Sequence, residues 1–310
     1  MADYGTTGRP VILLTGARGQ LGFELRRALS LWGDVAALDR ASLDLADDVR
    51  IAEVMRSLRP RIVVNAGAYT AVDRAESEPE LARKINVEGP AALAQEAARL
   101  GSFLVHYSTD YVFDGAKEGW YRESDRPDPL SVYGKTKLEG ERCVEASGAS
   151  HAVIRTSWVF GLHGANFLKT IVGTAMRRDA LSIVADQFGA PTPASLIADI
   201  TAIMVARYLA APDRFPSSVY HAAASGETTW HAYADYALRV LRAKGVALRV
   251  AEDAVRPIPM SEYPSAAPRP ANSRLDTTKL RETFGIALPN WKTGVDYVIE
   301  QLVETAQVMA

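Results

Sequence analysis

Short apolar runs alternate with longer amphipathic stretches along the first half of the chain. We predict buried strands from the apolar runs at residues 11–14, 35–38, 61–64, 103–107 and 152–156. Apolar residues at helical spacing predict helices at residues 20–31, 50–58, 80–100 and 131–147. Pro90 inside the third of these predicts a kink or a new helix start. Strands and helices in this order indicate βαβ units, a parallel sheet and right-handed crossovers.

After about residue 158 the alternation becomes irregular. Helices are predicted at residues 165–178, 195–209, 229–244 and 292–305, and short strands at residues 181–184 and 219–221. Four prolines mark residues 258–274 as a loop. We therefore expect an α/β fold with a doubly wound parallel sheet over residues 1–158 and a smaller lobe over residues 159–310. Some strands of this lobe are expected to rejoin the sheet.

Three glycines lie directly after the first predicted strand. Gly16, Gly19 and Gly22 have the spacing G-x-x-G-x-x-G, a variant of G-x-G-x-x-G, and they open the first predicted helix. Glycine permits a tight turn and close approach of the backbone to a pyrophosphate. The helix start offers free N–H groups and a partial positive charge to that anion. A purely structural turn is the alternative, but the position between strand and helix favours a dinucleotide site.

The choice of cofactor depends on residues near the end of the second predicted strand. Asp39 follows this strand, 17 residues beyond Gly22, where an acid often binds the adenosine ribose hydroxyls of NAD. Its neighbour Arg40, and Arg18 in the glycine loop, can instead meet the 2′-phosphate of NADP. Arg40 as a solvated surface charge is an equal alternative. We favour NADPH and expect NADH to be accepted.

The sequence Tyr133-Gly-Lys-Thr-Lys137 lies on a predicted helix. Residues four apart share a helix face, so the phenol and the ammonium are expected to be neighbours. A free tyrosine has a pKa of about 10, and a nearby cation lowers it. Tyr133 would then serve as the general acid for a carbonyl that receives a hydride. Lys137 would also bind the nicotinamide ribose.

Two polar residues follow the fourth predicted strand, within the sequence HYSTDYVFDG at residues 106–115. Carboxyl ends of strands line the ligand crevice in sheets of this kind. Thr109 can hydrogen-bond a substrate carbonyl beside Tyr133, and Asp110 can orient substrate hydroxyls. Capping of the turn after the strand is the alternative role for both.

Composition and charge narrow the class of protein. The 310 residues are 48% hydrophobic and 23% charged, with a net charge of −2, so nucleic acid is not expected as a partner. Cys143 is the single cysteine and suits a reducing compartment. The first ten residues lack an apolar signal core, and no apolar run approaches the roughly 20 residues that span a bilayer. We therefore expect a cytoplasmic protein without membrane contact.

These motifs together resemble the extended short-chain dehydrogenase/reductase superfamily. Six segments are similar to its dTDP-4-dehydrorhamnose reductase family, namely residues 65–73, 106–115, 132–140, 155–160, 186–192 and 269–276. The resemblance runs from the glycine loop to the last predicted helix. It implies a Rossmann-type domain and a substrate-binding lobe. It also implies hydride transfer from NADPH or NADH to C4 of dTDP-4-dehydro-L-rhamnose, giving dTDP-L-rhamnose for cell-surface polysaccharide such as O-antigen.

The resemblance also implies roles for individual residues. Tyr133 would donate the proton, Lys137 would be its cationic partner, and Thr109 would hold the carbonyl oxygen and tune the tyrosine. Substrate contacts are expected from Asp110, Trp158, Arg269 and Arg274. The two arginines would clamp the diphosphate by charge-assisted hydrogen bonds, with surface salt bridges as the alternative. Packing in the core is the alternative role for Trp158.

The expected cofactor site is larger than the substrate site. It comprises Gly16, Arg18, Gly19, Gln20, Leu21, Gly22, Asp39, Arg40, Asp44, Leu45, Ala66, Ala68, Tyr69, Thr70 and Tyr107, together with Tyr133 and Lys137. Within it, the resemblance assigns residues 19–21 to the pyrophosphate. Asp39, Asp44 and Leu45 would surround the adenosine.

Several alternatives remain open at this point. Ala17-Arg18 departs from the lysine or threonine common before the middle glycine, which affects the balance between NADH and NADPH. Some family members carry Mg²⁺ at a dimer contact, so Mg²⁺ is possible here, but the five scattered histidines and the absence of a carboxylate cluster give no metal motif in the sequence. A homodimer is compatible with the sequence.

A related dehydratase or epimerase is one other function, although Tyr111 stands where dehydratases have glutamate. A non-catalytic regulatory subunit is another, although it would not need Tyr133 or Lys137.

Overall fold

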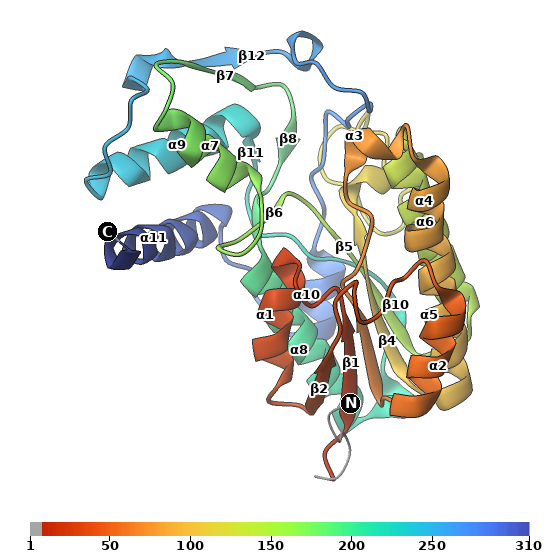
Figure 1. Ribbon diagram of the computed structural model, residues 1–310. Helices are drawn as coiled ribbons and strands as arrows, with labels where there is room; N and C mark the ends of the chain where they lie inside the picture. Colours follow the sequence, from red (N-terminus) through yellow and green to blue (C-terminus); the bar gives the residue numbers. More distant parts are fainter. Residues whose placement is uncertain (1–7, 310) are drawn as a thin grey trace.

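The computed structural model describes residues 8–309 and shows two connected lobes (Figure 1). The first seven residues, which belong to the segment where no signal core is expected, lie outside the described residues. The larger lobe contains a six-stranded sheet in the order β10-β5-β4-β3-β1-β2, in which all neighbours are parallel. Its strands are β1 (Val11–Thr15), β2 (Asp34–Ala37), β3 (Ile62–Asn65), β4 (Phe103–Thr109), β5 (His151–Thr156) and β10 (Ser218–His221).

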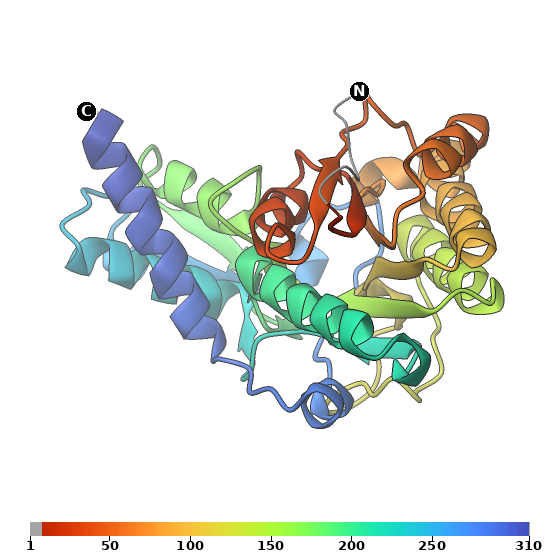
Figure 2. The same ribbon diagram turned by 90° about the horizontal axis from the view of Figure 1, so that it is seen from below.

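Helices cover both faces of this sheet, which confirms the predicted doubly wound architecture. One face carries α1 (Gln20–Leu29), α8 (Ala194–Ala210) and α10 (Thr278–Phe284), and the other carries α2 (Asp48–Leu58), α5 (Gly89–Leu100) and α6 (Val132–Ala146). Figure 2 shows α1 and α8 side by side beneath the sheet. The strand β10 of this sheet and the helix α8 that covers it come from beyond residue 158. The sheet and its helices therefore draw on both predicted domains.

The strand side chains divide between two apolar cores. In β1, Ile12 and Leu14 pack into the core beneath α1 and α8, whereas Leu13 packs into the core beneath α2, α5 and α6. All five side chains of β1 are buried. Strands buried on both faces explain why the sequence shows continuous apolar runs here instead of alternation.

The long helix predicted over residues 80–100 is interrupted just before Pro90. It consists of α4 (Pro79–Arg83), a wide π-helical turn (Lys84–Glu88) and α5, with Pro90 in the first turn of α5. Proline has no N–H to donate to the preceding turn, and the first turn of a helix is where this costs least. The predicted new start at Pro90 is confirmed. The short α3 (Val72–Ala75), before α4, was not predicted.

The smaller lobe packs three helices against short strand pairs. Its elements are α7 (Phe167–Ala175), α9 (Trp230–Ala243), α11 (Trp291–Met309), and the pairs β7 (Leu181–Val184) with β12 (Val255–Ile258), β6 (Val159–Phe160) with β9 (Thr192–Pro193), and β8 (Phe188–Gly189) with β11 (Thr228–Thr229). The strand β12 was not predicted because it contains Pro257. This proline is tolerated since β12 pairs only with β7 and forms an edge. Within residues 8–309, none of the helices combines the length and apolar character that crossing a bilayer requires.

Candidate active site

A cavity of about 650 Å³ lies at the carboxyl ends of the sheet strands, between the two lobes. Most of the predicted site residues line it, although they come from six different elements and loops. They are Gly16, Arg18, Gly19, Gln20, Leu21, Asp39, Arg40, Ala66, Ala68, Thr70, Tyr107, Thr109, Asp110, Tyr133, Lys137 and Trp158. The fold therefore brings the glycine loop and the Tyr133–Lys137 pair to one cavity.

The glycine loop has the geometry of an anion cradle. Gly16 has a φ of 65°, and a Cβ there would lie 2.6 Å from the backbone nitrogen of Gly67. A Cβ on Gly22 would lie 2.1 Å from the carbonyl oxygen of Gly16, so helix α1 can approach the loop only because residue 22 is glycine. Gly19 precedes the first turn of α1, and Gly19, Gln20 and Leu21 line the cavity, where free N–H groups of a helix start can hold an anion. Gly22 itself packs against the loop and is not a lining residue.

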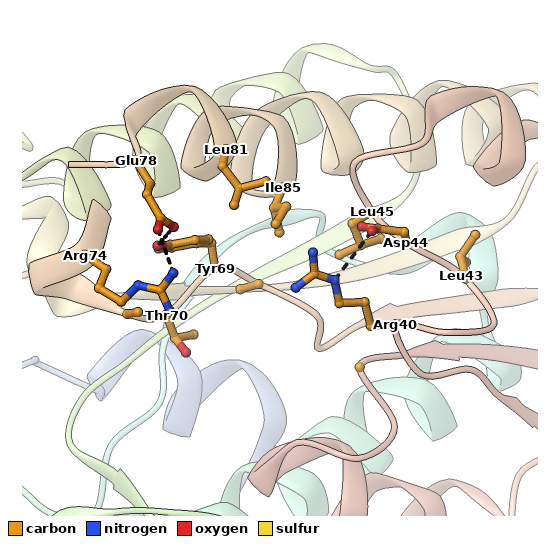
Figure 3. A pocket seen from close by; sticks show the side chains of 13 residues that line it. Arg40, Leu43, Asp44, Leu45, Tyr69, Thr70, Arg74, Glu78, Leu81 and Ile85 are labelled. Atoms are coloured by element: carbon orange, nitrogen blue, oxygen red, sulfur yellow. Dashed lines mark hydrogen bonds and ion pairs between the residues drawn. The ribbon is translucent and has the colours of Figure 1, made fainter. Parts of the chain in front are cut away.

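A second cavity of about 270 Å³ continues the first one past Gly16 and Arg40 (Figure 3). Asp44 and Leu45, which the sequence analysis places near the adenosine, line this cavity together with Tyr69. Leu81 of α4 and Ile85 point into the same space and give it an apolar wall, which the sequence did not reveal. A flat apolar wall beside polar groups suits a purine base.

Asp39 already has hydrogen-bond partners for both of its oxygens. Its Oδ1 accepts from the backbone N–H and the hydroxyl of Ser42, at 3.1 and 2.8 Å, and its Oδ2 lies 2.8 Å from Nε of Arg18. These hydrogen bonds from Ser42, with a smaller effect of the Arg18 charge, lower the pKa of Asp39. Arg40 lies 3.5 Å from Asp44 and is largely exposed. This edge of the cavity thus holds two arginines, and its nearest acid is engaged.

Tyr133 lies in the first turn of α6, which begins where the hydroxyl of Ser131 accepts from the N–H of Gly134. The prediction that Lys137 lowers the pKa of Tyr133 is wrong. Burial raises this pKa to about 12, opposed by a hydrogen bond with Thr109 and reinforced by the charge of Asp110. The reason is that Tyr133 is buried, while Nζ of Lys137 donates to the carbonyl oxygen of Tyr107. Tyr133 is therefore held as a neutral phenol.

Lys137 is buried and its Nζ donates to the carbonyl oxygen of Tyr107 at 2.6 Å. Burial lowers the pKa of Lys137 to about 8, and the carboxylate of Glu141 opposes this shift. Glu141 forms a buried bidentate salt bridge with Arg155 of β5, with contacts of 2.6 and 2.9 Å. The lysine thus lies near a carboxylate that is itself neutralised.

Thr109 and Asp110 stand at the end of β4, beside Tyr133. The Thr109 hydroxyl donates to Asp110 at 3.0 Å and accepts from the N–H of Tyr111, so Thr109 lines the cavity and also caps the 3₁₀ turn Asp110–Val112. Burial raises the pKa of Asp110 to about 6, opposed by hydrogen bonds with Ser273 and Thr109. The ring of Tyr111 packs edge-on against Tyr133.

Trp158 has a strained backbone at the cavity wall. Its φ of 47° lies in the left-handed region, which costs a non-glycine residue about 1–3 kcal/mol and is concentrated at functional sites. Its ring stacks on Trp230 with centroids 3.6 Å apart. Trp230 also lines the cavity but was not predicted, because it lies 72 residues away at the start of α9.

A third cavity, of about 260 Å³, adjoins the first at Tyr111 and Trp230. Gln187 and Arg269 line it, and the Nε2 of Gln187 is buried without a hydrogen-bond partner among the described residues. Arg269 also bonds Asp73 at 2.8 Å. Arg274 is not among the lining residues of these three cavities; it bonds Glu227 at 2.7 Å. Of the two arginines that the sequence analysis assigns to the substrate diphosphate, only Arg269 lines one of these cavities. In residues 8–309, His, Cys, Asp and Glu side chains nowhere gather in a group of three or more that could hold a metal ion.

Comparisons with known proteins agree with this geometry. The family model described as "RmlD substrate binding domain" matches residues 10–304. The chain is 44% identical to dTDP-4-dehydrorhamnose reductase of Escherichia coli K12, covering 96% of this chain and 99% of that protein. It is 45% identical to the Burkholderia thailandensis reductase, covering 94% and 99%. The crystal structure of the Bacillus anthracis reductase in complex with NADP superposes with a TM-score of 0.85 at 31% identity, covering 94% of this chain and 99% of that one. The chain belongs to the dTDP-4-dehydrorhamnose reductase family.

Proposed function

We propose that this protein reduces the C4 ketone of dTDP-4-dehydro-L-rhamnose to dTDP-L-rhamnose, for the synthesis of rhamnose-containing surface polysaccharides such as O-antigen. The observation that carries this proposal is that Tyr133, Lys137 and Thr109 share one cavity with the glycine loop. The names of the curated relatives, at 44% and 45% identity over nearly their whole length, support the same reaction.

The glycine loop and the second cavity fit a dinucleotide cofactor. The N–H groups at the start of α1 would hold the pyrophosphate, and the cavity lined by Leu45, Leu81 and Ile85 would hold the adenine. Lys137 would bind the nicotinamide ribose. The reduced nicotinamide supplies the hydride when it is bound.

NADPH fits this site better than NADH. Asp39, the acid that would otherwise read the ribose hydroxyls, accepts from Ser42 with one oxygen and faces Arg18 with the other. Arg40 lines both cavities and Arg18 lines the first one, and their exposed guanidinium groups would pair a 2′-phosphate there. The NADP complex of the Bacillus anthracis relative supports this choice. Comparison of kcat/KM with the two cofactors tests it, and a preference for NADH would contradict it.

Tyr133 would protonate the oxygen that develops negative charge at C4. A phenol whose pKa is raised to about 12 stays protonated at neutral pH, so it begins the reaction as an acid. Thr109 would turn its hydroxyl proton from Asp110 to the same oxygen and hold the ketone in place. Asp110 would accept from a sugar hydroxyl, and Trp158 would pack against the sugar ring.

The nucleotide end of the substrate would extend into the third cavity, within the lobe formed by residues 159–310. Gln187 offers a buried N–H that lacks a partner among the described residues, and Arg269 offers a guanidinium on the same wall. These donors suit the diphosphate and the base of a nucleotide sugar. Arg274 would act on the substrate only if it left Glu227.

A cofactor-consumption assay tests the proposed reaction. The purified protein is mixed with NADPH and dTDP-4-dehydro-L-rhamnose, and the absorbance of the reduced cofactor is followed. One equivalent of NADPH should disappear for each equivalent of dTDP-L-rhamnose formed. An epimerase or dehydratase would give product without net loss of reduced cofactor, and a regulatory subunit would give neither. Each of these results would refute the proposal.

We further propose that the protein works in the cytoplasm as a homodimer. Cys143 is free in the structure, which suits a reducing compartment. Light scattering of the purified protein tests the oligomeric state, and a monomeric mass would contradict the dimer.

A further inference from the structure

A row of polar side chains crosses the sheet beneath the active site. Thr15, Asn65 and His106 are register partners on β1, β3 and β4, so they lie side by side on one face. The next row on the same face, Leu13, Val63 and Leu104, is fully apolar and belongs to the core. All three members of the polar row are buried, and His106 is fully inaccessible. Such a row needs internal hydrogen bonds to offset its desolvation.

The hydrogen bonds along this row have a fixed direction. The backbone N–H of Gly67 can only donate, and it does so to Oγ1 of Thr15 at 3.2 Å. The Thr15 hydroxyl then donates to Oδ1 of Asn65 at 2.6 Å. This leaves the amide nitrogen of Asn65 facing Nδ1 of His106 at 3.0 Å, and that ring nitrogen must accept. A neutral imidazole has one N–H, so the proton of His106 lies on Nε2.

The end of the row meets the catalytic lysine. Nε2 of His106 lies 3.5 Å from Nζ of Lys137, whereas Nζ donates to the Tyr107 carbonyl at 2.6 Å. An N–H directed at an ammonium brings two donors together, which accounts for the long contact. The same N–H can donate to the lone pair of a neutral amine. The row therefore favours release of a proton from Lys137.

We propose that the polar row of Thr15, Asn65 and His106 is a hydrogen-bond relay of fixed direction, which makes Lys137 a ready proton donor during the reduction. The inference rests on the proposed function, in which Tyr133 gives its proton to the ketone oxygen. A proton leaving Nζ of Lys137 restores the Tyr133 hydroxyl, and Lys137 is left as a neutral amine that accepts from His106. His106 does not line the cavity, so it is a positioning residue.

Other groups around Lys137 oppose or reinforce the release of its proton. Glu141, on the same helix, favours the ammonium, but its carboxylate is bound by Arg155 from β5. The Tyr107 carbonyl on β4 also accepts from the ammonium. Burial and the charge of Lys137 hold the pKa of His106 well below its ordinary value, so the imidazole stays neutral. The tautomer of His106 is then the remaining variable, and Thr15 sets it from the far end of the row.

Thr15→Val is the discriminating variant. It removes the hydroxyl that donates to Asn65, so the amide can turn and accept from Nδ1 of His106, leaving Nε2 free to accept from the ammonium. The loss of turnover at high pH should then move upward by about 0.5–1 pH unit, a three- to tenfold rise in proton affinity. Thr15→Ser keeps the hydroxyl, so its turnover should depend on pH as in the wild-type protein.

Thr192→Val is the matched control. Thr192 is also buried, and its hydroxyl likewise accepts from a backbone N–H and donates to an oxygen, at 3.2 and 3.0 Å. The pH dependence of turnover in Thr192→Val should match that of the wild-type protein. A Thr15→Val profile that stays within about 0.2 unit of the wild type, or moves downward, overturns the relay, as does an equal shift in the control.

The tautomer of His106 can also be read directly in the wild-type protein. Nitrogen NMR of the labelled imidazole should show a protonated Nε2 and an unprotonated Nδ1 at neutral pH. A protonated Nδ1 overturns the proposal, whether or not the Thr15 variants fold. This measurement needs no substrate, so it remains decisive if the protein fails to reduce the proposed ketone.

Discussion

The contact between Gly22 and Gly16 predicts a large loss of cofactor affinity in Gly22→Ala. The new Cβ would lie 2.1 Å from the Gly16 carbonyl oxygen, which is about 1.3 Å short of an ordinary contact of 3.4 Å. It would also lie 2.8 Å from the Gly16 carbonyl carbon, so the clash is with backbone on a tight turn. The first turn of α1 and the loop must separate by about this distance. The N–H groups that would bind the pyrophosphate then move out of hydrogen-bond range.

The loss of one or two hydrogen bonds to a charged group amounts to about 3 kcal/mol, so the Kd for NADPH should rise about 100-fold. Fluorescence titration with NADPH measures it. The overpacked contact should also lower the free energy of unfolding by about 1–3 kcal/mol, measured by urea denaturation. A Kd within about threefold of the wild type would refute the idea that this contact shapes the cofactor cradle.

Gly173→Ala provides the control. Gly173 lies within helix α7, and its new Cβ would come no nearer than 3.7 Å, to the flexible end of Arg177. The affinity for NADPH should be unchanged, and stability should rise by about 0.5–1 kcal/mol because alanine is the better helix former. A large change in Kd in this variant would show that helical Gly→Ala changes affect the site indirectly.

Three further predictions concern the catalytic residues and their surroundings. Tyr133→Phe should bind NADPH normally and lose about 10²–10⁴-fold in turnover, and unchanged turnover would show that another group supplies the proton. Turnover should fall as the pH rises through about 8, because burial lowers the pKa of Lys137 to about 8 and the reaction uses its ammonium form; a flat profile up to about pH 10 would contradict this. Glu141→Gln leaves the buried Arg155 guanidinium without its counter-charge, so urea denaturation should show a loss of about 3–5 kcal/mol. A loss below about 1 kcal/mol would show that water or another group compensates.

The regular elements of the larger lobe could be predicted because their signals are local. Four strands that are buried on both faces, β1, β3, β4 and β5, give continuous apolar runs, and Pro90 marks the new helix start. The strand β12 and the helix α10 could not be found this way. Pro257 argues against a strand unless the strand is known to lie at an edge, and α10 is only seven residues long.

The residues of the candidate active site also divide into those that local spacing predicts and those that it does not. The glycine spacing and the Tyr133–Lys137 spacing are local, and both led to the cavity. Trp230, by contrast, reaches Trp158 from helix α9, and no spacing indicates this contact. The direction of the Tyr133 pKa shift was also predicted wrongly, because spacing gives the neighbour of a group but not its burial.

By itself, the sequence determined the doubly wound α/β class, the dinucleotide loop and the helical Tyr-Lys pair, because each depends on residues within a few turns of one another. Only the tertiary structure decided that Asp39 bonds Ser42 and Arg18, that Arg269 lines the third cavity whereas Arg274 bonds Glu227, and that Lys137 faces Tyr107 and His106. These outcomes depend on strand register and on which groups are removed from water. The register places Thr15, Asn65 and His106 in one row, although they lie 50 and 41 residues apart along the chain.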